Sequence, residues 1–506
     1  MWQAQVGSAT FPGAACLNLL QVVVDRTVSI RAPDLSWEVL FLEWIVLQLL
    51  AKYDPKLQSP LPSYNRSVAS PARLWEVLTM SIALPRLIPV HQHFAQAPSL
   101  DVRLTIESQL ESKLSDSRVA PGRRIAVAVG SRGITRLGEI VTLVVEWLRQ
   151  RGAKPFIVPA MGSHGGATPR GQTEILAGYG VSEAALGLPV CASMEVERLG
   201  RTDDGVEVYF SREALGADGI VVINRVKPHT DFAGRIGSGI LKMTAIGLGK
   251  HTGASTVHAA AMSLGYEHVI RTVARRILRT APVLAGVAIL EGPRHETVKT
   301  EVLAPVEIEA REEELHAEAK LLMPRLPFDA IDLLIVDRMG KNISGTGMDP
   351  NIIGRGAHGY STLFRDQQEV ALGFPVIRRI FVRELTPESH GNAIGIGLAD
   401  FTTRRLVEAM DPQATSINVL TALSLHLAKT PMYFDTDREA IELSLISACL
   451  ADTAAARVVR IGDTLSLERV EVSEAYTSEL SQRPQLEPLT ASREMAFDQC
   501  GNLLPL

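Results

Sequence analysis

The sequence predicts an α/β protein made of two α/β domains, with mainly parallel sheets and a cleft between the domains. Apolar runs of strand length alternate with helical patterns in both halves of the chain, as they do in βαβ units. The chain has 506 residues, more than one domain usually holds. Glycine-rich loops follow several of the apolar runs, at the strand ends where open α/β sheets bind ligands.

In the first half we expect an N-terminal α/β domain over residues 80–323. Predicted strands cover 124–129, 155–159, 219–223 and 283–289, with short antiparallel strands between 190 and 212. Predicted helices cover 101–117, 134–151, 168–179, 263–280 and 307–322. The pattern over 134–151 is the clearest, because its apolar residues recur on one face and Gly152 then ends the helix.

In the second half we expect a C-terminal α/β domain over residues 324–455, beginning at the prolines Pro324 and Pro327. Its predicted strands are 331–336 and 381–385, and its predicted helices are 400–410 and a segment from Asp437, as the cap, to Cys449. Residues 456–478 are expected to form returning strands that pack on the N-terminal domain. The polar residues 479–506 are expected to form a loosely held tail.

Residues 1–79 differ from the rest and are expected to be an extension of uncertain role. Their apolar run, 39–51, is interrupted by Glu43 and Gln48 and is shorter than the roughly 20 residues that a membrane helix needs. No basic segment and small-residue cleavage site mark a signal peptide. We therefore expect no association with a membrane.

Composition excludes other broad classes. The chain is 46% hydrophobic and 21% charged, which is ordinary for a globular protein. A net charge of −5 argues against a general nucleic-acid binder. The four cysteines show no C-x-x-C spacing, which disfavours a cysteine-based metal site and fits a reducing compartment. We expect a cytoplasmic protein with no nucleic-acid partner.

Chemistry-bearing residues gather in three glycine-containing loops. His164 stands between glycines after the second predicted strand, and Lys341 lies in a glycine-rich loop after residue 336. The central stretch, 221–258, holds His229, Lys242 and His258. It also contains Gly237 and Gly239, followed by a second glycine-rich turn over 247–253. Two histidines on separate loops could exchange the roles of acid and base across a substrate.

Two arginines, Arg132 and Arg136, follow the first predicted strand at a helix N-terminus, a place that suits phosphate or carboxylate. Together with Lys341 they could hold a carboxylate, although solvated surface arginines fit the same pattern. Common nucleotide motifs fail. A Walker A loop would need glycine at Thr244, and a dinucleotide fingerprint would need glycine at Lys242. The chain contains no H-E-x-x-H sequence.

Taken together, these loops resemble the nickel-pincer lactate racemase family. The matching residues are Gly162-Ser-His164-Gly, then Pro228-His229…Ala233-Gly234…Gly237-Ser-Gly239…Lys242, with His258 sixteen positions further on. The resemblance covers roughly residues 85–470. It implies an isomerase that racemises or epimerises a small α-hydroxy acid by hydride transfer to and from the cofactor.

The resemblance also implies roles for individual residues. Lys242 would carry the nickel-pincer nucleotide (pyridinium-3-thioamide-5-thiocarboxylic acid mononucleotide) as a thioamide, and His258 would ligate nickel. His164 and His229 would be the two acid/bases. Arg132, Gly237 and Gly239 are assigned to cofactor binding, and Arg136 and Lys341 to substrate binding. Enzymes of cofactor synthesis are then expected partners.

Some features depart from the family pattern. The spacing from His229 to Lys242 is a few residues longer, and Gly133 stands where an acidic residue is expected before Arg136. His251 competes with His258 as the metal ligand, although spacing favours His258. The alternatives are a non-catalytic protein that binds sugar acids or phosphate, and a nicotinamide-type oxidoreductase. A modified lysine would exclude the first, and the missing dinucleotide fingerprint disfavours the second.

Overall fold

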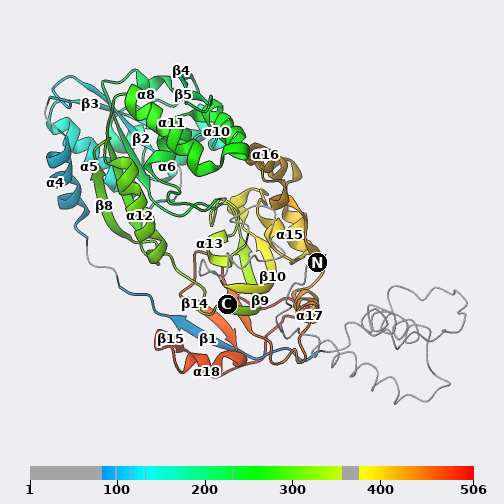
Figure 1. Cartoon of the computed structure of the whole chain (residues 1–506). Helices are drawn as coiled ribbons and strands as arrows, with labels where there is room; N and C mark the ends of the chain where they lie inside the picture. The colour runs from blue at the N-terminus through cyan, green and yellow to red at the C-terminus, as the bar shows by residue number, and fades with distance from the viewer. Residues whose placement is uncertain (1–81, 97–99, 115–116, 131–132, 231, 356–374) are drawn as a thin grey trace, which may run out of the picture.

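The computed structural model describes residues 82–96, 100–114, 117–130, 133–230, 232–355 and 375–506 (Figure 1). The extension expected over residues 1–79 lies outside the described residues, as does Arg132. Two sheets organise the described chain, one in each half. None of the described helices is long and apolar enough to cross a membrane.

The first sheet has five strands in the order β3-β2-β6-β7-β8. These are β3 (Lys154–Pro159), β2 (Arg124–Val129), β6 (Gly219–Arg225), β7 (Val283–Glu291) and β8 (Thr297–Leu303). The first four are parallel, and β8 pairs antiparallel with β7. Residues of β6 are buried at almost every position because helices cover both faces, which explains its continuous apolar sequence.

Helices of the first half divide between the two faces of this sheet. One face packs against α10 (Lys250–Leu264), α11 (Tyr266–Thr280) and α12 (Ile308–Leu322). The other packs against α4 (Val102–Lys113), α5 (Leu137–Gln150) and α6 (Pro169–Gly178). Shorter elements complete this half: α7 (Glu183–Leu186), the hairpin β4 (Val196–Arg201) and β5 (Glu207–Ser211), and α8 (Arg212–Leu215).

The glycine-rich turn expected over residues 247–253 is present only in part, because Leu248 and Gly249 form a turn while residues 250–253 begin α10. The chain runs from α9 (Ile240–Lys242) through a π-helical turn over Met243–Gly247 and this short turn into α10, where Lys250 has a positive φ of 55°. Gly249 lies in a close contact as well: a Cβ there would lie 2.8 Å from the carbonyl oxygen of Ala245. Glycine at this position therefore allows the backbone to approach closely within the turn.

The second sheet has eight strands in the order β12-β11-β10-β9-β13-β14-β1-β15. These are β12 (Met432–Phe434), β11 (Phe401–Thr403), β10 (Val376–Leu385), β9 (Ala330–Met339), β13 (Val458–Ile461), β14 (Arg469–Ser473), β1 (Leu87–Gln92) and β15 (Leu486–Pro488). The strands from β12 to β13 are parallel, and the remaining pairings are antiparallel.

The described part of the second half also contains helices. They are α13 (Pro350–Ile353), α15 (Arg404–Ala409), α16 (Pro412–Ala422), α17 (Asp437–Ser447) and α18 (Thr477–Leu480). The N-cap of α17 is Thr436, whose side chain accepts from the Glu439 N–H, and not Asp437 as the sequence suggested. Asp437 is fully buried instead and pairs with Arg383.

Three features of the domain organisation differ from expectation. Residues 456–478 form strands of the second sheet, where β13 pairs with β9 and β14 pairs with β13 and with β1, the strand that comes from residues 80–323. The strand β1, although it precedes the first sheet in sequence, also belongs to the second sheet, where its blue arrow lies among orange and red elements (Figure 1). The tail is held, because β15 pairs with β1 and Leu503 is buried.

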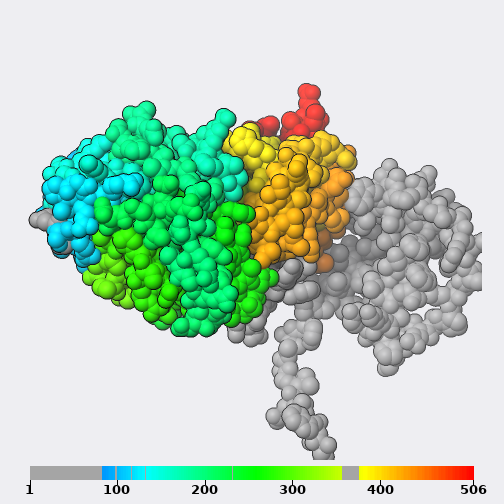
Figure 2. Space-filling view, turned by 90° about the horizontal axis from the view of Figure 1, so that it is seen from above, coloured from blue at the N-terminus to red at the C-terminus, as the bar shows by residue number. Residues whose placement is uncertain are grey.

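Both sheets are mainly parallel and covered by helices, so the predicted α/β fold class is confirmed. Seen from above, the cyan and green surface of the first half abuts the yellow and orange surface of the second (Figure 2). The two sheets therefore place the loops at the ends of β6 and β9 near a shared boundary. Those loops contain the residues described next.

Candidate active site

The glycine-rich loop after β6 is closed by a backbone bridge. The amide of Lys227 donates to the carbonyl of Ser238, and the amide of Ser238 donates back to Lys227, each over 2.8 Å. Immediately after this bridge, α9 presents Lys242. The chain thereby turns back on itself, and His229 of the loop lies over the end of α9.

His229 and Lys242 form the centre of the site. The Nζ of Lys242 lies 2.8 Å from Nε2 of His229 and 3.4 Å from the hydroxyl of Ser238. His229 is only 9% exposed. A lysine ammonium can only donate, so while Lys242 is charged, Nε2 of His229 accepts and the ring proton sits on Nδ1. The contact is a route by which a proton can pass between the two side chains.

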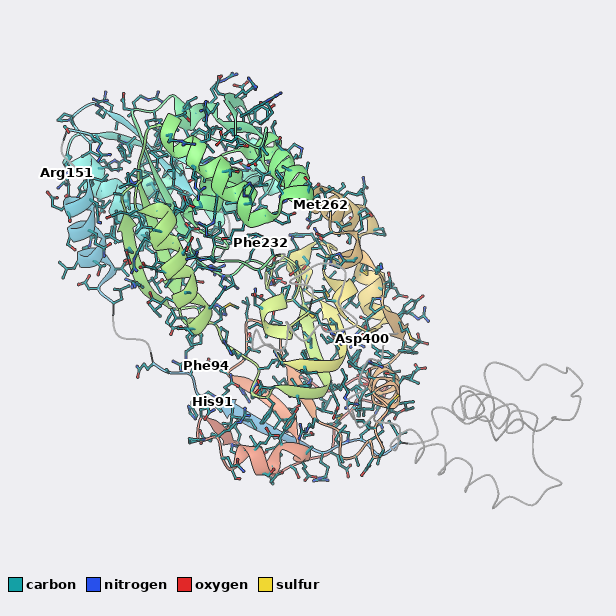
Figure 3. All side chains as sticks on the ribbon, viewed as in Figure 1. His91, Phe94, Arg151, Phe232, Met262 and Asp400 are labelled. Atoms are coloured by element: carbon teal, nitrogen blue, oxygen red, sulfur yellow. The ribbon has the colours of Figure 1, made fainter. Side chains whose placement is uncertain are left out.

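An aromatic stack connects this pair to His258. The ring of Phe232 stacks on His229 with centroids 4.5 Å apart, and on Tyr266 at 5.3 Å. The Tyr266 hydroxyl, at the start of α11, lies 3.1 Å from Nδ1 of His258 on α10. Figure 3 places Phe232 on the stretch of chain that faces the second half of the molecule. The structure thus brings Lys242, His229 and His258 into one continuous cluster.

His164 lies on a neighbouring loop, and its side chain is exposed. This loop follows β3 and is anchored to the turn after Lys242 by a hydrogen bond from the Gly162 amide to the Gly247 carbonyl, 3.0 Å long. The loop is therefore tied to the same helical segment that carries Lys242. The His164 side chain is exposed to solvent, which is what an acid/base group that contacts a substrate requires.

A buried lysine holds the loop that carries His164 in place. Lys250 is fully buried, and its Nζ donates to the carbonyl of Pro159 at 2.6 Å and lies 3.4 Å from Oε1 of Gln172. The Gln172 amide donates in turn to the carbonyl of Gly162 at 2.9 Å. Burial lowers the pKa of Lys250 to about 8. Sequence reasoning missed both Lys250 and Gln172.

The second half of the molecule also reaches the loop. Asp349, which begins α13, forms an ion pair with Lys227 at 2.8 Å. Asn351 donates to the carbonyl of His229 at 3.1 Å. Burial opposes ionisation of Asp349, but the adjacent Lys227 ammonium outweighs it and lowers the pKa of this carboxyl. The sequence pattern Asp349-Pro350 marks a helix start, yet it gave no sign of these contacts.

Arg136 and Lys341, the two described cations expected to bind substrate, contact different sets of residues. Arg136 has a left-handed backbone conformation and forms a two-pronged ion pair with Glu139, with both distances 2.6 Å. Lys341 donates to the carbonyl of Gly345 and to the side chain of Asn418. A role for Arg136 in binding a carboxylate therefore requires its pair with Glu139 to open.

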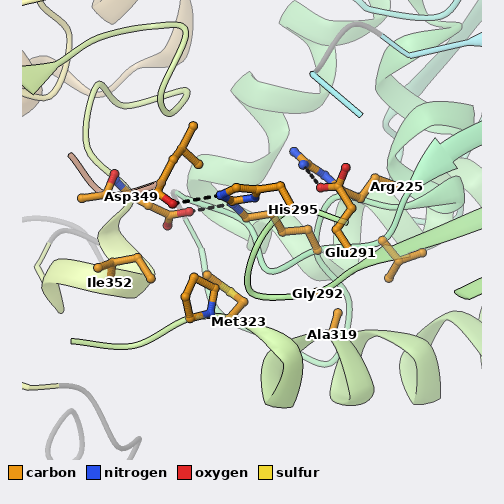
Figure 4. A pocket seen from close by; sticks show the side chains of 13 residues that line it. Arg225, Glu291, Gly292, His295, Ala319, Met323, Asp349 and Ile352 are labelled. Carbon is orange, nitrogen blue, oxygen red and sulfur yellow. Dashed lines mark hydrogen bonds and ion pairs between the residues drawn. The ribbon is translucent and has the colours of Figure 1, made fainter. Parts of the chain in front are cut away.

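A pocket lies at the boundary between the two halves (Figure 4). Its walls include Arg225, Lys227 and His295 from the first half and Asp349 and Thr464 from the second. The ion pairs Arg225–Glu291 and Lys227–Asp349 line the pocket, and the second of them joins the two halves. Lys227 connects this pocket to the glycine-rich loop, while His229, Lys242 and His258 are not among its lining residues.

The described residues contain no cluster of three or more histidine, cysteine, aspartate or glutamate side chains that could hold a metal on its own. His258 is nevertheless arranged as metal-ligating histidines usually are. Its Nδ1 meets a hydroxyl that fixes the ring, so a ligand role falls to Nε2. His251, the competing candidate, is exposed on the first turn of α10.

Comparison with known proteins was then informative. Residues 78–267 match the lactate racemase N-terminal domain, a range that contains His164, His229, Lys242 and His258. No curated protein matches. Among solved structures, the chain is similar to the lactate racemase apoprotein from Thermoanaerobacterium thermosaccharolyticum. That comparison gives 14% identity and a TM-score of 0.40, over 75% of this chain and 89% of that chain. Residues 78–267 are thus similar to a lactate racemase N-terminal domain, and this match supports a lactate racemase-like family.

Proposed function

We propose that this protein is a nickel-pincer-dependent racemase or epimerase of an α-hydroxy acid. The match of residues 78–267 to the lactate racemase N-terminal domain supports a racemase-type isomerase. The observation that carries the finer proposal is the contact between Lys242 and His229, joined to His258 through Phe232 and Tyr266. One cluster thus holds an amine for covalent attachment, an imidazole for metal ligation and an imidazole for proton transfer.

The residues present fit the nickel-pincer nucleotide. Lys242 offers its amine from a half-buried position beside an imidazole that can accept a proton from it. His258 offers a neutral imidazole, a good nickel donor, in a ring orientation fixed by Tyr266. The faces of Phe232 and Tyr266 suit a planar aromatic group. When bound, the nickel-pincer nucleotide supplies a site that accepts a hydride and returns it.

In this proposal, the chain's own side chains move the proton. His229 takes the proton from the substrate hydroxyl at Nε2 for one enantiomer and gives it back for the other. His164 does the same from the opposite direction, on its exposed loop. The ring of His229 is held by its stack with Phe232, and its backbone by the hydrogen bond from Asn351. Two bases on two loops are needed because the two enantiomers present opposite faces.

The experiment uses full-length protein co-expressed with enzymes of cofactor synthesis. A panel of α-hydroxy acids is incubated with it, and the two enantiomers are separated on a chiral column. His164→Ala and His229→Ala should each abolish turnover in both directions. His268→Ala is a matched control, since His268 is an exposed histidine paired with Asp204. Full activity of either active-site variant would remove that histidine from the mechanism.

A further inference from the structure

Two ionisable side chains of α12 lie directly behind the glycine-rich loop. Glu312 is fully buried, and its Oε2 accepts the Leu241 N–H at 2.9 Å. One helical turn later, His316 is almost fully buried, and its Nδ1 lies 2.9 Å from the carbonyl of Arg235. A carbonyl can only accept, so Nδ1 carries the ring proton and Nε2 carries the lone pair.

The loop approaches these side chains so closely that only glycine fits. A Cβ on Gly239 would lie 2.3 Å from Oε1 of Glu312, and a Cβ on Gly237 would lie 2.8 Å from Nε2 of His316. Contacts below 3.0 Å require something to move. Gly237 and Gly239, assigned from sequence to cofactor binding, therefore have a second reason to be glycine, namely the side chains behind them.

Packing alone does not account for this pair. Within the described part of the chain, Oε1 of Glu312 and Nε2 of His316 are buried without a hydrogen-bond partner. Burying polar atoms in this way is costly, and an apolar residue would fill the space at lower cost. Burial raises the pKa of Glu312 to about 7 and lowers that of His316 to about 4.

We infer that Glu312 is a positioning residue for Lys242, an assignment that rests on the proposed function of that lysine. Its carboxyl binds the Leu241 N–H and, through a further backbone contact, Ile240. It thereby fixes the turn from which Lys242 projects toward His229. His316 holds the other arm of the loop through Arg235. The charged groups that act on Glu312 are Arg271 of α11 and Glu309 of α12.

Cofactor-free protein tests this assignment by hydrogen exchange. Glu312→Gln keeps an acceptor oxygen, so exchange of the segment 239–243 should stay within threefold of wild type. Glu312→Leu removes the acceptor, so exchange there should rise tenfold or more while β7 keeps its protection. Glu318→Gln is the matched control, because Glu318 lies on the same helix and pairs with Lys299 at the surface. Unchanged exchange in Glu312→Leu, or a rise that extends equally to β7, would overturn the assignment.

A second readout follows Lys242 itself. The cofactor-free protein is labelled with acetic anhydride, and the acetylation of Lys242 is compared with that of exposed Lys154 by mass spectrometry. Glu312→Leu should change this ratio at least threefold, and Glu312→Gln should restore it.

If Glu312→Leu does not fold, the wild-type segment 239–243 should gain threefold protection from pH 6 to 8, corrected for intrinsic exchange, and Glu312→Gln should show none. An equal gain in both proteins would overturn the assignment.

Cofactor loading separates this inference from the proposed function. If wild-type Lys242 never gains a covalent mass increment, the proposed function fails while the exchange results stand on their own. If wild type is loaded, Glu312→Leu should load at least tenfold less and Glu312→Gln should load normally. Equal loading of wild type and Glu312→Leu would show that Lys242 needs no positioning by Glu312, and would refute the inference.

Discussion

Replacing Gly239 with alanine should destabilise the first half of the molecule. The added methyl would lie 2.3 Å from Oε1 and 2.4 Å from Cδ of Glu312, a side chain with no exposed surface. Overpacking of this kind costs about 1–3 kcal/mol. Displacing the carboxyl also leaves the Leu241 N–H unsatisfied, which costs a further ~1–3 kcal/mol. We expect the free energy of unfolding to fall by about 2–6 kcal/mol.

Urea unfolding followed by circular dichroism measures this change. Gly178→Ala is the control, because a Cβ there meets nothing within 4 Å, and it should leave the free energy of unfolding unchanged or raise it by up to about 1 kcal/mol. Combining Gly239→Ala with Glu312→Ala removes the clash, so the cost of the methyl should drop below about 1 kcal/mol. A cost under about 0.5 kcal/mol in the single variant, or an equal cost in both backgrounds, would refute the close packing described above.

Three further predictions concern side chains that the sequence did not reveal. The folded pKa of Lys250 is depressed to about 8, so the folded state binds fewer protons than the unfolded state between pH 8 and 10.5. Unfolding free energies should therefore rise over this range by up to about 3 kcal/mol more in wild type than in Lys250→Met, and parallel profiles would contradict this. Asp349→Ala should lower the free energy of unfolding by about 3 kcal/mol at pH 7, because it leaves Lys227 unpaired, and the difference should shrink in acid as the wild-type carboxyl is protonated through its depressed pKa. Urea titrations at several pH values test both, and an effect of Asp349→Ala that persists unchanged in acid would count against the ion pair. Tyr266→Phe should weaken nickel binding by about 10–100-fold in a chelator competition, because it removes the hydroxyl that orients His258, and an unchanged affinity would exclude that role.

Much of the first half could be predicted from the sequence because its signals are local. The strands β2 and β3 coincide with apolar runs, and α5 shows its buried stripe as helical periodicity. The helix α10 was missed because its glycines indicate a turn when only local rules are applied. Gly249 lies too close to the carbonyl of Ala245 for a Cβ, and close packing of that kind leaves no trace in local periodicity.

Pairings between distant segments explain the other errors. The strand β1 pairs with β14, where Leu87 lies opposite Ser473, and no pattern in either strand specifies so distant a partner. The tail is held in place by Arg383 and Arg460, which donate to the carbonyls of Leu503 and Leu504. Contacts from a distant arginine to a backbone carbonyl are independent of the local side chain, so the tail sequence reads as polar and loose.

In the candidate site, too, local motifs could be predicted from the sequence and contacts between distant residues could not. The glycine-rich loop and its motif residues pointed to Lys242 and His229, and the structure places these two side chains in contact. The aromatic residues Phe232 and Tyr266, which link them to His258, gave no motif signal. Glu312 lies 71 positions from the amide that it binds, so only the folded chain reveals it.

The central claim is that Lys242 carries the nickel-pincer nucleotide and His258 ligates its metal. Intact mass and nickel content of the co-expressed protein test it most directly, with Lys154→Ala as the control for loss of an exposed lysine. We predict a covalent mass increment in wild type that is lost in Lys242→Ala. In His258→Ala the increment should persist while nickel is lost. Active protein with an unmodified Lys242, or full nickel occupancy without His258, would contradict the claim.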